Sequence, residues 1–218
     1  MKTLLRYLAG TKPMVLTLRP KIIPHSKQTT FDIDTYVDSD WAGCATSRRS
    51  TSGMALYFLG TLITSQSRTQ ATVALSSGEA ELYAIGLGVS ESLFIRSLLL
   101  ESQLSKNVNI RIHTDSTAGK SMATRFGTSK KTKHVQLRFL FIQELVASGV
   151  VSIKKVSGTS NPSDVMTKYI TKEVLHRHLM ALGITYPFGR VGWLRTACVQ
   201  TLSFTLHTYA RTFPQHSP

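Results

Sequence analysis

Four carboxylates lie where their residue types and spacing could hold a metal ion. Asp38 follows the run TYV, Asp115 ends NVNIRIHTD, Glu81 lies in SSGEAELYA, and Asp164 lies in NPSDVMTKYI. Like charges a few ångströms apart repel each other strongly unless a cation lies among them. Three or four hard oxygen ligands suit Mg²⁺ or Mn²⁺, and the sequence shows no set of cysteines and histidines at metal-ligand spacing. These acids therefore predict a divalent metal site.

The acids are predicted to lie at the ends of regular elements. Residues 31–38 alternate in the manner of a half-buried strand, which Asp38 ends. Ser76 or Ser77 is available to cap a helix whose first turns contain Glu79 and Glu81. The other strand or helix patterns are 53–60, 61–68, 107–115, 133–149, 150–158 and 161–170, the last with Asn161 as cap and Pro162 at its first position. The order β-β-β-α-β-α-β-α predicts an α/β fold with one mixed five-stranded sheet and helices on its faces.

Composition narrows the class of partner. The 218 residues include 26 Lys and Arg against 12 Asp and Glu, a formal net charge of +14, which predicts a polyanionic partner. There is no run of about 18 apolar residues and no signal-peptide pattern, so we expect no membrane span. Cys44 and Cys198 are far apart, so no disulfide framework is expected. These features favour an intracellular protein, located in the cytoplasm, the nucleus or virus-like particles.

Basic side chains are concentrated in one segment that has no acid. Five of them lie between residues 125 and 138, and two more follow the first predicted strand. A charge run is often only a solvated loop, but the net charge of this chain favours contact with phosphates. The predicted nucleic-acid-binding residues are Arg48, Arg49, Arg125, Lys130, Lys131, Lys133 and Arg138.

Five motifs, in order, resemble the RNase H domain of copia-type LTR retrotransposon Pol polyproteins. They are YVDSDWAG…RRSTSG, LSSGEAELYA, IHTDSTAGKSMA, TKHVQLRF and NPSDVMTKYI. The leading LLRYLAGTK resembles the end of the reverse transcriptase region that precedes this domain. The resemblance implies that residues 1–30 are the end of that region and a linker, and that 31–172 form an RNase H-like domain. Residues 173–218 are expected to be a basic, poorly ordered tail.

The resemblance also implies an Asp-Glu-Asp-Asp metal site. Asp38, Glu81, Asp115 and Asp164 match its four positions, which would hold two Mg²⁺ or Mn²⁺ ions and carry the catalysis. Glu79 is an alternative to Glu81, because residues two apart on a helix point about 200° apart and only one of them can serve. We prefer Glu81 because its Glu-Leu step matches the motif.

The implied function is hydrolysis of the RNA strand of RNA–DNA hybrids by a metal-dependent endonuclease. Its partners would be the hybrid and an upstream reverse transcriptase region. The sequence departs from the family in two places: the loop SGTSNP has no histidine, and LITSQS has no tryptophan. An alternative is a truncated, weakly active or inactive nucleic-acid-binding relic of such a polyprotein. Integrase-type strand transfer on the same fold is disfavoured by the Asp-Glu-Asp-Asp order.

Overall fold

The computed structural model describes residues 2–20, 30–125, 138–168 and 170–185. Its α-helices are α1 (Lys2–Thr11), α2 (Ser77–Glu101), α3 (Thr117–Thr124), α4 (Arg138–Ala147) and α5 (Lys172–Ala181). Its strands are β1 (Val15–Leu16), β2 (Thr30–Asp40), β3 (Thr51–Phe58), β4 (Thr61–Thr69), β5 (Asn107–Thr114), β6 (Val151–Lys155) and β7 (Ile184–Thr185). Two 3₁₀ helices, η1 (Gly158–Ser160) and η2 (Pro162–Met166), follow β6.

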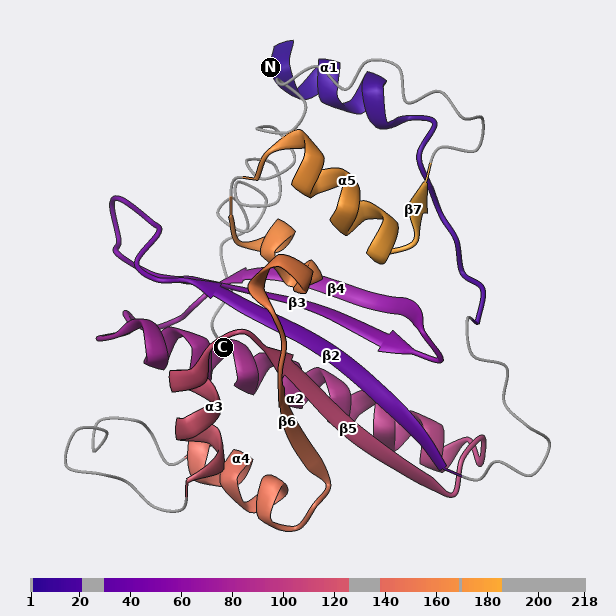
Figure 1. Cartoon of the computed structure of the whole chain (residues 1–218), viewed down its shortest axis with the longest axis vertical. Coiled ribbons are helices and arrows are strands. Elements are labelled where there is room, and N and C mark those ends of the chain that lie inside the picture. Colours follow the sequence, from indigo (N-terminus) through magenta and orange to yellow (C-terminus); the bar gives the residue numbers. More distant parts are fainter. Residues whose placement is uncertain (1, 21–29, 126–137, 169, 186–218) are drawn as a thin grey trace, which may run out of the picture.

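The main sheet has five strands in the order β4-β3-β2-β5-β6 (Figure 1). Strands β2, β3 and β4 pair antiparallel, whereas β5 runs parallel to both β2 and β6. The turn between β3 and β4 places Leu59 and Gly60 at φ of 52° and 71°, as a tight hairpin turn requires. The predicted α/β fold with a mixed five-stranded sheet is confirmed.

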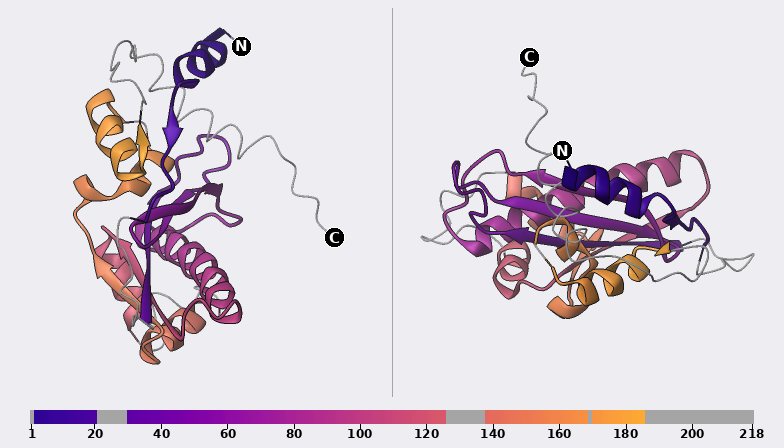
Figure 2. Two further views of the ribbon diagram at one scale, coloured as in Figure 1. Left: turned by 90° about the vertical axis from the view of Figure 1, so that its right-hand side faces the viewer. Right: turned by 90° about the horizontal axis from the view of Figure 1, so that it is seen from above.

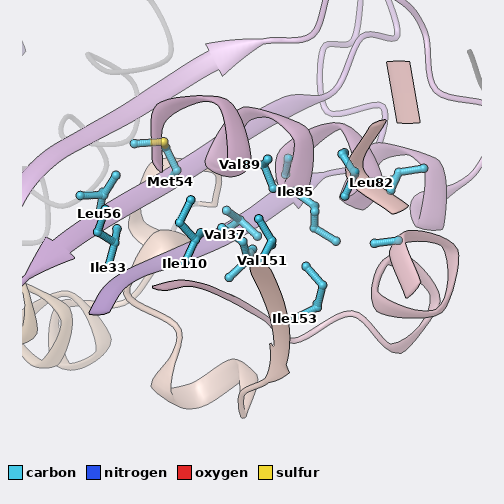
Figure 3. Close-up of a cluster of buried hydrophobic side chains, with 14 of the residues drawn as sticks. Ile33, Val37, Met54, Leu56, Leu82, Ile85, Val89, Ile110, Val151 and Ile153 are labelled. Carbon is cyan, nitrogen blue, oxygen red and sulfur yellow. The ribbon is translucent and has the colours of Figure 1, made fainter. Parts of the chain in front are cut away.

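One face of the sheet packs against α2. Alternate side chains of β2, including Ile33 and Val37, are fully buried there with Leu82 and Ile85 of the helix (Figure 3). The helix lies very close to the strand at Gly88, where an added Cβ would come 2.6 Å from Cγ1 of Val37. This packing fixes the start of α2 relative to the end of β2.

The other face is covered by elements that were expected to be loose. In α5, Leu175 and Leu179 are buried against Val165 and Tyr57 in a second apolar cluster. Strand β7 pairs antiparallel with β1, which lies in the segment predicted to be a linker (Figure 2). Residues 173–185, which were expected to be poorly ordered, are instead part of α5, β7 and the turn between them, while the domain boundary at residue 172 stays a prediction. Residues 186–218 lie outside the described part of the chain.

Two predicted helices differ from the structure or are only partly described, and one helix was not predicted. The helix predicted over residues 161–170 is the short 3₁₀ helix η2, although Asn161 caps it and Pro162 opens it as expected. Helix α3 was not predicted; it is only 8 residues long and Met122 is its one large apolar residue, although Ser116 caps it by accepting a hydrogen bond from the Gly119 N–H. Of the predicted helix 133–149, the structure describes residues 138–149, and α4 ends at Ala147.

Helix α2 alone, in the described part of the chain, has the length and composition of a membrane-crossing helix. That test is also passed by the core helices of soluble proteins, and α2 packs along the sheet, so the finding is weak evidence for a membrane span.

A charged network lies on the same face of the sheet as Tyr36. Asp34 accepts hydrogen bonds from Nε of Arg111 and from Nε2 of His113, each at 2.7 Å, and Asp32 pairs with Arg111 at 2.9 Å. The ring of His113 stacks on Tyr36 at 4.5 Å between centroids. Burial would raise the pKa of Asp34, but the hydrogen bonds from His113 and Arg111 outweigh it and lower that pKa to about 2.

Asp34→Asn is expected to lower the free energy of unfolding by roughly 2 kcal/mol near neutral pH. Because the pKa of Asp34 in the folded chain lies below its ordinary value of 3.8, this stabilisation is complete above that value and disappears as the pH falls toward 2. Urea unfolding of both proteins across this range measures the difference. The control is Asp32→Asn, whose more exposed carboxylate should contribute less than about 1 kcal/mol. A difference that does not depend on pH would contradict the prediction.

Candidate metal centre

Three of the four predicted ligands come together at one edge of the sheet. Asp38, Glu81 and Asp115 each offer a carboxylate oxygen, and these atoms all lie within 4.8 Å of one another. Asp38 is only 1% exposed, and Glu81 is 9% exposed. The arrangement brings three acids into a space that one divalent cation could bridge.

The positions of the two aspartates follow from strand pairing. Val37 and Thr114 are partners in the parallel pair β2–β5. Asp38 and Asp115 are the residues that follow them, so both aspartates lie at the same edge of the sheet. Glu81 reaches this edge from the first turns of α2, whose start is fixed by Ser76. Neighbouring strand ends and a helix start are where sites gather in α/β sheets.

Glu79 has a different role from Glu81. Its carboxylate accepts hydrogen bonds from the Leu75 N–H and the Tyr83 hydroxyl, each at 2.8 Å, while its own N–H donates to Ser76. These contacts close the first turn of α2 in the manner of a capping box. Glu79 therefore lies on a helix face that is turned away from the three clustered acids, as the sequence-based preference for Glu81 expected.

Asp164 is joined to the cluster through a lysine. The ammonium of Lys168 lies 3.0 Å from Oδ1 of Asp38 and 2.9 Å from Oδ1 of Asp164. The hydroxyl of Thr167 donates to the other oxygen of Asp38. The fourth predicted ligand thus approaches the site on the η2 side, but Lys168 stands between it and Asp38.

The electrostatics of the cluster favour a bound cation. Burial raises the pKa of Asp38 to about 6, although Lys168 and Thr167 limit the shift. Burial, followed by the nearby charges of Asp38 and Asp115, raises the pKa of Glu81 to about 8. Burial and the neighbouring carboxylates thus disfavour the charged forms of these acids, and a divalent ion would offset both effects.

Two further features fit a divalent metal. Oε2 of Glu81 is buried and has no hydrogen-bond partner, so it is available as a ligand. Gly158 leaves room for the Asp115 carboxylate, because an added Cβ would lie 3.0 Å from Oδ2 of that residue. The donor set is entirely of carboxylate oxygens, which Mg²⁺ and Mn²⁺ prefer.

Helix η2 docks on the sheet at a glycine. Gly53 is the β3 partner of Asp38, and an added Cβ there would lie 2.7 Å both from Cβ of Met166 and from Cγ2 of Thr167. The amide of Asn161 also donates to the Val37 carbonyl at 2.9 Å. These close contacts hold Thr167 and the following lysine against Asp38.

Gly53→Ala is expected to lower the free energy of unfolding by about 1–3 kcal/mol, because the new methyl group overpacks the contact with η2. Urea unfolding monitored by circular dichroism measures the change. Thr64→Ala, which alters a half-buried side chain on β4, is the control and should cost less. An unchanged unfolding midpoint for Gly53→Ala would mean that η2 can shift at little cost.

The predicted nucleic-acid-binding residues are only partly described. Arg48 and Arg49 are exposed in the turn between β2 and β3, just beyond the end of β2 that carries Asp38. Arg125 is exposed at the end of α3. Arg138 begins α4, but its side chain is not described, and three predicted residues lie outside the described ranges: Lys130, Lys131 and Lys133.

Sequence reasoning missed Lys168 and Thr167. A signal was present, since Lys168 follows Asp164 by four residues, the spacing of an ion pair on a helix. Nothing local indicated that both residues would also contact Asp38, which lies 130 residues before the lysine.

Comparisons with known proteins agree with the motifs. No family model matches the sequence. The chain is 31% identical over 137 residues to the retrovirus-related Pol polyprotein from transposon TNT 1-94 of Nicotiana tabacum, covering 63% of this chain and 10% of that protein. It is 29% identical over 185 residues to the corresponding polyprotein from transposon RE1 of Arabidopsis thaliana, covering 85% of this chain and 12% of that protein. The chain thus spans about a tenth of the length of these curated relatives.

A similar solved structure is the N-terminal RNase H domain of a Mycobacterium tuberculosis protein, with a TM-score of 0.47 and 10% identity. The superposition covers 69% of this chain and 98% of that one.

Proposed function

We propose, for a chain homologous to the Pol polyproteins of copia-type retrotransposons, that it is a metal-dependent endonuclease that hydrolyses the RNA strand of RNA–DNA hybrids. The observation that carries the proposal is the cluster of Asp38, Glu81 and Asp115, with oxygens within 4.8 Å of one another. Such a site suits phosphodiester hydrolysis, because bound divalent ions can stabilise the charge that develops on the attacking and leaving oxygens.

The residues of this site would have separate roles in holding the ions and in orienting the ligands. Asp38, Glu81 and Asp115 would hold the first of two Mg²⁺ or Mn²⁺ ions, and Asp164 with Asp38 would hold the second. When bound, the ions supply Lewis acidity that activates water and stabilises the leaving 3′ oxygen. Thr167 keeps the Asp38 carboxylate in one orientation by donating to it.

The proposed substrate fits the charge of the chain. A formal net charge of +14 attracts a polyanion, and the exposed Arg48 and Arg49 lie at the end of β2 that carries Asp38. Arg125, Arg138 and the lysines between them remain proposed phosphate contacts, as the sequence predicts. Contacts with 2′-hydroxyl groups across the shallow minor groove would distinguish the RNA strand from the DNA strand.

A cleavage assay tests the proposal directly. The full chain is incubated with an RNA–DNA hybrid, duplex RNA and duplex DNA of one sequence, each with Mg²⁺, with Mn²⁺ and with a chelator. We expect cleavage of the RNA strand of the hybrid only, and none with the chelator. Cleavage that continues in the chelator would contradict a metal-dependent mechanism.

One observation favours a second candidate, a nucleic-acid-binding relic without activity. Lys168 occupies the space between Asp38 and Asp164, where the second ion would bind. Under this alternative the chain binds the hybrid with an affinity that falls as the salt concentration rises. It does not cleave the hybrid in the presence of either Mg²⁺ or Mn²⁺.

A further inference from the structure

Lys168 is held by two of the four proposed metal ligands. Its ammonium lies 3.0 Å from Oδ1 of Asp38 and 2.9 Å from Oδ1 of Asp164, while Thr167 donates to the remaining oxygen of Asp38. A lysine ammonium is ordinarily charged at neutral pH, and here it contacts both carboxylates. A permanent positive charge therefore stands between these two aspartates.

The opposite side of Asp38 has no such cation among the described residues. There Glu81 and Asp115 approach Asp38, and Oε2 of Glu81 is buried without a hydrogen-bond partner. The proposed metal site thus has two unequal halves. In one half, no lysine or arginine of the described residues forms an ion pair with Glu81 or Asp115, whereas in the other half Lys168 pairs directly with Asp38 and Asp164.

We infer that Lys168 is a positioning residue that acts as a built-in cation, so that the free chain binds one divalent ion and admits a second only when the lysine leaves. This inference rests on the proposed function and adds a regulation of the same site. The ion would bind at Asp38, Glu81 and Asp115. A second ion between Asp38 and Asp164 would meet the ammonium at close range, and like charges there repel strongly.

The lysine is able to leave. Its side chain is 42% exposed, whereas that of Asp38 is 1% exposed, so the lysine lies at the solvent-facing side of the pair. A lysine ammonium is also a compact point charge on a flexible four-carbon stem, so it can move without disturbing the backbone. A phosphodiester in the site would give the displaced ammonium another anion to contact. The second ion is therefore expected to enter together with the nucleic acid.

Counting bound Mn²⁺ tests this inference without measuring activity. The full chain is titrated with Mn²⁺ in the absence of nucleic acid, and the free ion is followed by its electron paramagnetic resonance signal. The wild type should bind about one ion, and Lys168→Met, which keeps the length but removes the charge, should bind about two. The thermal unfolding midpoint should rise more with Mn²⁺ in the variant than in the wild type.

Two control variants test whether the number of bound Mn²⁺ ions depends on the charge of Lys168 in particular or on any lysine near the site. Lys168→Arg keeps a cation between the aspartates and should retain the stoichiometry of the wild type. Lys155 lies near Asp115 but contacts its carbonyl oxygen and the Thr117 hydroxyl rather than a carboxylate. Lys155→Met should therefore also bind the same number of ions as the wild type.

The outcomes distinguish this inference from the proposed function. Two ions on the wild type, or equal numbers on the wild type and a folded Lys168→Met, would overturn the role of Lys168 and leave the nuclease proposal standing. No Mn²⁺ on any variant would overturn both. If Lys168→Met does not fold by circular dichroism, Lys168→Gln provides a second neutral variant, and the wild-type count still decides whether one ion or two are bound.

Discussion

Asp38→Asn is expected to abolish Mg²⁺-dependent cleavage of the RNA strand while the chain stays folded. Asp38 belongs to both halves of the proposed site: it lies in the cluster with Glu81 and Asp115, and it pairs with Lys168. An amide is neutral and has one oxygen, so it is a poor substitute for a carboxylate that two cations share. The cleavage rate with saturating hybrid should fall by several orders of magnitude.

The control for this variant is metal binding measured apart from activity. Mg²⁺ should raise the thermal unfolding midpoint of the wild type, because a ligand that binds only the folded state stabilises it, and should leave that of Asp38→Asn unchanged. Circular dichroism checks the fold. A folded variant that still cleaves near the wild-type rate would remove Asp38 from the site.

Glu81→Gln is expected to reduce the cleavage rate by several orders of magnitude, and Glu79→Gln to change it by only a few-fold. Glu81 supplies a carboxylate oxygen within 4.8 Å of those of Asp38 and Asp115, and its Oε2 is buried without a hydrogen-bond partner. Glu79 instead accepts hydrogen bonds from Leu75 and Tyr83, and a glutamine oxygen can still accept one of them.

The two glutamine variants are matched in chemistry and lie two residues apart on one helix, so they differ only in the face that they occupy. Initial rates with the hybrid at saturation compare the chemical step, and unfolding midpoints compare stability. Glu79→Gln should lower the midpoint by more than Glu81→Gln, because it weakens the start of α2. The reverse pattern in both measurements would assign the ligand role to Glu79.

Much of the fold was predictable because its signals are local. The alternation of β2, the hairpin of β3 and β4 and the cap at Ser76 each depend on neighbouring residues, and the structure confirms all three. The positions of Asp38 and Asp115 were predictable for the same reason, since a strand pattern leads to each of them, although β2 does not end at Asp38 as predicted but continues to Asp40, where it still pairs with β3. Helix geometry predicted that only one of Glu79 and Glu81 could serve, and the choice of Glu81 came from the match of its Glu-Leu step to the motif; the contacts of Glu79 with the start of α2 agree with that choice.

The errors arose where local pattern is weak and distant contacts decide. Helix α5 was placed in a poorly ordered tail because residues 173–218 show no sustained period, yet Leu175 and Leu179 are buried against the sheet. Likewise, the pairing of β1 with β7 joins residues about 170 positions apart in the chain, and no periodic pattern in the sequence predicts it. Such contacts depend on the apolar face of the finished sheet, which does not exist until the strands have paired.

The sequence by itself determined which acids could form the site, because residue type and strand or helix register are properties of short segments. Only the tertiary structure decided that the site is asymmetric. Gly53 lets η2 approach the sheet closely enough for Lys168 to reach Asp38, a contact between residues 130 positions apart. The physical reason is that a salt bridge between buried and half-exposed groups requires two backbones to be packed at a set distance, and that distance results from the whole fold rather than from any one segment.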